Sequence, residues 1–147
     1  MPPATKTKEF DALGLILGFA GFFIVIGLTL QAFPDIVSRG SSLADIFANG
    51  QFNIPYRIGQ PIIFFLTLAG IWGVAAGGLR AIFTQFKRNA IGDVIWGFFA
   101  IFVAALFRWY YGGIIGIADF GPLIVIGLGL VIVANVAVWY LASFVNR

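Results

Sequence analysis

The chain has 147 residues, of which 61% are hydrophobic and only 10% are charged, and its formal net charge is +3. A soluble domain carries roughly 25% charged residues, so this chain lacks the polar surface that would cover a globule in water. It contains no cysteine, no histidine and a single methionine, the residue types that supply most protein ligands for haem, copper, zinc and iron–sulfur centres. The composition predicts an integral membrane protein that binds no metal and no redox cofactor by itself.

Two long uncharged runs predict the first two membrane spans. A helix rises about 1.5 Å per residue, so about 20 apolar residues cross the hydrocarbon core of a bilayer. Uncharged residues run from Ala12 to Phe33 and from Ile58 to Leu79. They predict a first transmembrane helix over 12–33 and a second over 58–83.

Aromatic residues define the third and fourth spans. The third uncharged run is short and stops before Arg108, but Trp109–Tyr111 follow directly. Trp and Tyr settle at headgroup level, and an arginine beside them can extend its charge to the same depth. We therefore expect a third span over 93–111. The run from Phe120 to Asn146 predicts a fourth span over 121–145.

The connection between the first two spans is too long for a structureless loop in a compact domain. We expect a short helix from Ser42 to Asn49, ended by Gly50, that lies on the outer membrane surface. An exposed docking loop for a partner is the alternative. The predicted fold class is thus all-α: one domain over 1–147 with four transmembrane helices and one short interfacial helix. Apolar side chains at helical spacing support the short helix: Leu43, Ile46 and Phe47.

Basic residues predict the orientation. With four spans, both termini and the loop between the second and third spans share one side of the membrane. That side carries six of the nine Lys and Arg residues: Lys6, Lys8, Arg80, Lys87, Arg88 and Arg147. The positive-inside rule then places both termini in the cytoplasm, with the cell (inner or plasma) membrane as the expected location.

The net positive charge has an explanation in lipid. On the cytoplasmic side, Lys87 and Arg88 are suited to anionic lipid headgroups. A specific protein-docking patch is the alternative interpretation of these two residues. Membrane lipid is therefore an expected partner, and no nucleic acid is needed to account for the charge.

The acidic residues predict helix capping and not chemistry. Asp11, Asp93 and Asp119 each precede a predicted span, where a carboxylate accepts bonds from free N–H groups and meets the positive end of the helix dipole. No charged residue is expected in the middle of a span, which argues against ion-coupled transport. General acid–base catalysis lacks histidine, so we expect no catalytic residue and no enzyme activity.

Three polar residues near the membrane have two interpretations each. Arg108 and Asp119 are expected to pair and to clamp the turn between the third and fourth spans, with a gate or an anionic-ligand contact as the alternative. Asn135 is the strongly polar residue near the middle of the fourth span. We expect it to hydrogen-bond to a neighbouring helix, and a pore-lining or cofactor-contacting role is the alternative.

Small residues recur at spacings of three and four in the first two spans. Such residues form a groove that lets another helix backbone approach closely. We therefore expect the first two spans to meet tightly, within the chain or with a neighbouring chain. The helix-packing residues are Gly14, Gly18 and Gly21 in the first span and Ala69, Gly73 and Gly77 in the second.

Three functions fit this sequence. The one we expect is a non-catalytic accessory subunit of a larger multisubunit membrane complex, whose partners are other integral membrane subunits and lipid. The first alternative is a subunit that assembles with copies of itself into a membrane-embedded filament, pilus or virion shell. The second alternative is a small oligomeric channel or carrier with Asn135 as its polar pore contact.

Overall fold

The computed structural model describes residues 12–50, 53–83 and 87–145. Within these ranges the chain is all-helical, and four of its five helices are long and apolar enough to cross a membrane. The predicted all-α class with four transmembrane helices is confirmed. The helices are α1 (Ala12–Ala32), α2 (Ile36–Ala48), α3 (Tyr56–Phe83), α4 (Lys87–Tyr111) and α5 (Ile117–Val145), and the short one is α2.

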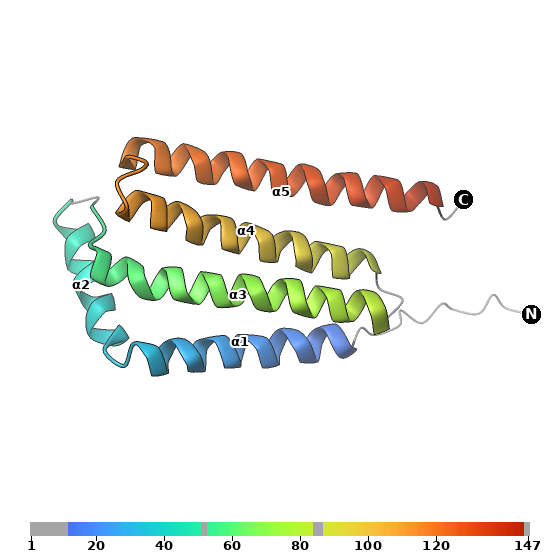
Figure 1. Cartoon of the computed structure of the whole chain (residues 1–147), viewed down its shortest axis with the longest axis horizontal. Coiled ribbons are helices and arrows are strands. Elements are labelled where there is room, and N and C mark those ends of the chain that lie inside the picture. The colour runs from blue at the N-terminus through green and yellow to red at the C-terminus, as the bar shows by residue number, and fades with distance from the viewer. Residues whose placement is uncertain (1–11, 51–52, 84–86, 146–147) are drawn as a thin grey trace, which may run out of the picture.

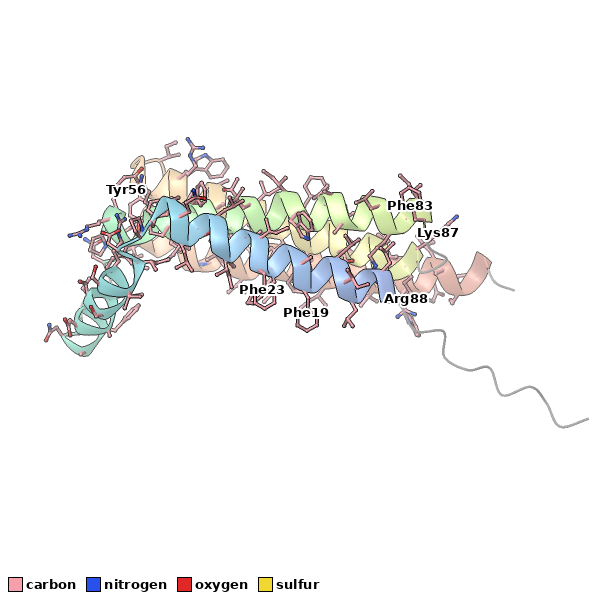
Figure 2. The ribbon with its side chains drawn as sticks, turned by 90° about the horizontal axis from the view of Figure 1, so that it is seen from below. Phe19, Phe23, Tyr56, Phe83, Lys87 and Arg88 are labelled. Atoms are coloured by element: carbon pink, nitrogen blue, oxygen red, sulfur yellow. The ribbon has the colours of Figure 1, made fainter. Side chains whose placement is uncertain are left out.

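The four long helices lie side by side in a single row, in the order α1, α3, α4 and α5, and adjacent helices are antiparallel (Figure 1). The contact between α3 and α4 is by far the most extensive, whereas α1 packs mainly on α3, and α5 mainly on α4. We call the end of the row where α1 begins and α5 ends the terminal end. The short helix α2 lies at the opposite end, at an angle to the row (Figures 1 and 2).

Three of the long helices, α3, α4 and α5, begin before the predicted spans. Helix α4 begins at Lys87 and not at Asp93, and α5 begins at Ile117 and not at residue 121. The uncharged run measures how much of a helix can lie in hydrocarbon, whereas the helix itself continues into the headgroup region, where polar side chains are tolerated. Asp93 therefore lies inside α4, and its expected role at the helix start is wrong. Asp119 lies within the first turn of α5 and not before the helix, and Asp11 lies outside the described residues.

A short helix does form in the first long connection, but it starts earlier than predicted. Helix α2 begins at Ile36, so Ser42 is an internal residue whose hydroxyl donates to the Ser38 carbonyl at 3.0 Å. The predicted end is correct, because Gly50 follows the helix with φ +69°, a left-handed conformation that favours glycine. No residue of α2 is buried. Its placement on the outer membrane surface stays a prediction.

Asp35 joins α2 to the beginning of α3. Its carboxylate pairs with Arg39 at 2.9 Å and with Arg57 at 3.2 Å, and Arg39 also donates to the Arg57 carbonyl at 2.7 Å. These guanidinium groups, chiefly that of Arg39, hold the pKa of the Asp35 carboxyl below its ordinary value. One carboxylate thus binds an arginine of α2 and an arginine of α3.

Candidate functional site

The small residues of α3 face α4. A Cβ atom added at Gly70 would lie 2.6 Å from the Gly97 carbonyl oxygen, and one at Gly77 would lie 2.7 Å from the Ala90 carbonyl oxygen. Gly73 is nearly as close, with 3.1 Å from its added Cβ to the Gly97 Cα. The two backbones therefore touch along this seam. Gly73 and Gly77 thus pack closely against a neighbouring helix, as expected for small residues. That helix is α4, the third span, and not α1, the first span.

Helix α1 receives side chains of α3 and not its backbone. A Cβ at Gly21 would overlap the indole of Trp72, whose Nε1 donates to the Leu17 carbonyl at 3.0 Å. At Gly14 an added Cβ would lie 2.6 Å from the Arg80 Cζ. Nothing lies within 4 Å of the equivalent position at Gly18. Two of the three predicted glycines of the first span thus hold a large side chain of α3, and the third is open.

Arg80 and Asp93 form an ion pair inside the helix row. Arg80 lies in the last turn of α3, is only 8% exposed, and donates to the Asp93 carboxylate on α4. Sequence reasoning counted Arg80 only among the basic residues of the cytoplasmic side and put Asp93 at a helix start, so it missed the pair. The pair could have been predicted from the helical hairpin. Two antiparallel helices with a short connection place residues side by side when they lie at similar distances from that connection.

The pair lines a polar cavity at the terminal end, between α3, α4 and α5. Its volume is about 450 Å³, and we call it the terminal cavity. The residues around it carry two positive charges and one negative charge, together with two amides: Arg80, Arg88, Asn89, Gly92, Asp93, Trp96, Asn135 and Val138. These groups converge from three helices that are consecutive in the row.

Asn135 contributes to the wall of the terminal cavity. Its amide nitrogen donates to the Val131 carbonyl at 2.9 Å, one turn earlier in its own helix. Its Oδ1 lies toward α4, 3.4 Å from where a Cβ of Gly92 would be. The hydrogen bond to another helix that we expected is replaced by one within α5, because the i−4 carbonyl is already within reach of the short side chain.

A smaller space, which we call the slot, borders the terminal cavity. It has a volume of about 220 Å³ and lies between α1, α3 and α4. Arg80, Asp93 and Trp96 line both spaces, so the cavity and the slot meet at these side chains. The rest of the slot is apolar or small: Gly14, Leu17, Gly18, Trp72, Gly73 and Ala76.

Lys87 and Arg88, the predicted headgroup residues, lie at the terminal end on opposite faces of the row (Figure 2). Both are exposed. The Arg88 guanidinium lies 5.3 Å from the centre of the Trp139 ring on α5, a cation–π geometry. Arg88 lines the terminal cavity, and Lys87 is not among its lining residues.

Arg108 does not pair with Asp119 in the part of the chain that the structure describes, so the predicted clamp is wrong. The α4–α5 turn is closed by backbone bonds instead, including one of 2.9 Å from the Ile114 N–H to the Trp109 carbonyl, with Gly113 at φ +70°. A ring contact of 4.7 Å between the centres of Phe107 and Phe120 adds to it. These local contacts hold the turn without a charge pair.

Arg108 instead lines a larger cavity of about 640 Å³ at the α2 end, between α3 and α4. Aromatic and neutral polar side chains form the rest of this wall. They include Phe33, Tyr56, Gln60, Phe64, Thr67 and Tyr111.

Comparisons with known proteins find no matching family model, no similar curated protein and no similar solved structure. The arrangement of the helix row and the residues of its cavities are therefore what indicates a function.

Proposed function

We propose that the protein is a non-catalytic accessory subunit of a larger multisubunit membrane complex, and that it packs between other subunits and lipid. The single-row arrangement carries this proposal. A row leaves both edge helices with one neighbour each, whereas a closed bundle would cover them on two sides. The uncovered helix surfaces are available to other subunits.

The two edges are strongly apolar. On α1, Phe19 and Phe23 are 60% and 67% exposed, and both point away from the row (Figure 2). On α5, Leu130 and Leu141 are 66% and 64% exposed. Lipid can cover such side chains. Each edge helix also has glycines at which no described side chain lies within 4 Å of an added Cβ, and such small residues let a foreign helix approach closely. The open glycines outside the slot are Gly27 on α1 and Gly121 and Gly129 on α5.

The ion pairs between helices support a structural role. Arg80 and Asp93 bind each other, and the Asp35 cluster holds α2 against α3. Charged side chains that form such pairs hold the helices in position relative to one another. The expected locations complete the proposal: the cell membrane, with both termini in the cytoplasm and α2 on the outer surface.

The decisive measurement is the native mass of the tagged protein after mild detergent extraction from its own membrane. We expect unlike subunits at fixed stoichiometry. A homopolymer of variable length would favour the filament or shell instead, and a small closed ring would favour the channel that Asn135 could line.

Two variants locate the interface. Gly27→Leu and Gly129→Leu each fill an open glycine on one edge, and an added Cβ at either position has no neighbour within 4 Å in the described residues. We expect at least one of them to lose the copurifying subunits while the chain itself stays folded. Full retention of partners by both variants would contradict docking through the glycines of the row edges.

A further inference from the structure

We propose that the terminal cavity and the slot together bind one anionic phospholipid, with its phosphate in the cavity and one acyl chain in the slot. This assigns a defined lipid site to a chain otherwise proposed as a subunit that packs against lipid in general. The argument rests on four features: the charge of the cavity, the small and apolar lining of the slot, the side chains that the two spaces share, and their depth along the helices.

The cavity suits a phosphate. Arg80 and Arg88 outnumber the one carboxylate, Asp93, which is engaged by Arg80. Arg88 is therefore the guanidinium whose charge is offset by no carboxylate of the wall, and a guanidinium matches phosphate oxygens with two parallel hydrogen bonds. The amides of Asn89 and Asn135 add neutral donors to the same wall.

The slot suits a hydrocarbon chain. Its floor is made by Gly73 and Ala76, and its α1 wall includes Gly18, where an added Cβ would meet nothing within 4 Å. The larger side chains of the wall, those of Leu17 and Trp72, are mainly hydrocarbon. A neighbouring helix is about 10 Å wide with its side chains and does not fit a space of about 220 Å³, so the occupant is a chain and not a helix.

The polar cavity lies at the terminal end and the apolar slot lies deeper along the helices, which matches the polar headgroup and apolar chain of a lipid. Arg80, in the last turn of α3, stands where they meet, and Trp72 lies eight residues, or about 12 Å, deeper along the same helix. The slot therefore runs from the terminal end toward the middle of the membrane. Trp96 lines both spaces, and its indole is the amphipathic side chain that membrane proteins place at the boundary of headgroup and hydrocarbon.

The test uses the full chain in a mild non-ionic detergent, titrated with phosphatidylglycerol or with phosphatidylcholine of the same acyl chains. Native mass spectrometry counts the bound lipids. We expect one phosphatidylglycerol per chain, bound about fivefold more tightly than phosphatidylcholine, the factor for one basic side chain near an anionic headgroup. Equal binding of the two lipids would overturn the proposal.

Matched variants separate the site from general attraction. Arg88→Gln should weaken phosphatidylglycerol binding about fivefold, and Lys87→Gln, next in sequence but on the other face of the row, should change it little. Gly18→Leu fills the slot and should weaken binding about tenfold, while Gly27→Leu, equally open but outside the slot, should not. Equal losses within either pair would refute a defined site.

Two further experiments test the cavity independently of the slot and distinguish a lipid from free phosphate. Asn135→Leu tests the cavity without touching the slot, with Val136→Leu as its control on the same helix, so the proposal stays testable if Gly18→Leu unfolds. We expect a loss only for Asn135→Leu, and its absence would count against the cavity. Glycerol phosphate is the soluble competitor: displacement at the concentration at which the lipid binds would show that the site takes free phosphate and would overturn the lipid.

Discussion

Glycine has opposite consequences in the middle and at the edge of this helix row. Between α3 and α4, Gly70, Gly77 and Gly97 bring two backbones into contact. On α1, Gly14 and Gly21 receive the large side chains of Arg80 and Trp72. Where the facing helix also has small residues, this spacing brings two backbones together in a rigid seam. Where the facing helix has long side chains, the same spacing makes notches that receive them.

The largest effect is expected in the seam. Gly97→Leu would place a side chain against the α3 backbone, because even its Cβ would lie 2.7 Å from the Gly70 carbonyl oxygen. Backbone cannot move aside as a flexible side chain can, so we expect a loss of about 3 kcal/mol or more in unfolding free energy, measured by SDS titration in mixed micelles. Gly129→Leu on α5, an open position, is the control and should change little. Similar values for the two variants would break the contrast between seam and edge.

The buried ion pair should give the next largest effect. Arg80→Leu leaves the Asp93 carboxylate without its arginine, and we expect a loss of about 2 kcal/mol, reduced from the usual value for buried pairs because the Asp93 side chain is 40% exposed. The double variant Arg80→Leu, Asp93→Leu should recover much of this loss, since no charge is then left behind. Additive losses in the same unfolding assay would show that the two side chains do not act as a pair.

A smaller effect is expected where α1 meets α3. Trp72→Phe keeps an aromatic ring in the notch at Gly21 but removes the hydrogen bond to the Leu17 carbonyl, worth about 1 kcal/mol. Faster hydrogen exchange in α1, with α3 and α4 unchanged, is the expected result. Trp139→Phe on the far edge is the control, and unchanged exchange in α1 would contradict the role of this bond.

The smallest effect concerns the attachment of α2. Asp35 has a lowered pKa in the folded chain, so its ionised form stabilises the fold at neutral pH, and this contribution is lost as the pH falls through the ordinary value of 3.8 and below. Proteolysis within α2 should therefore increase on acidification to about pH 3. The Asp35→Asn variant should be cleaved faster at pH 7 and should respond less to acid. If acid increased proteolysis equally in the unmodified chain and in Asp35→Asn, a group other than Asp35 would cause the acid sensitivity.

The sequence predicts the four long helices well because their signal is local. Each apolar run is long enough to cross a bilayer, and the Trp and Tyr residues near Arg108 identify the end of α4 correctly. The start of α4 is missed because Lys87 and Asn89 are polar yet helical. Charge within a run marks the edge of the hydrocarbon and not the end of a helix.

Contacts between helices could be anticipated only in part. The glycines of the second span indicate close packing, but nothing local says that the facing surface is Gly97 on α4 and not α1. Arg108 and Asp119 are neighbours in sequence across a short turn, yet backbone bonds and Phe107 close that turn and leave Arg108 to line a cavity. Which partner a side chain meets depends on how helices are rotated about their axes, and single-sequence patterns do not fix that rotation.

The backbone seam between α3 and α4 also has a consequence for biogenesis. These two helices are joined by a short connection and share the largest contact in the chain, so their pairing requires little loop-closure entropy. The hairpin is therefore the natural first folding unit, and α1 and α5 join it from either side through side chains alone. If folding starts at this hairpin, α1 and α5 are the last helices to pack. Each of them can then change its neighbours while the contact between α3 and α4 stays formed.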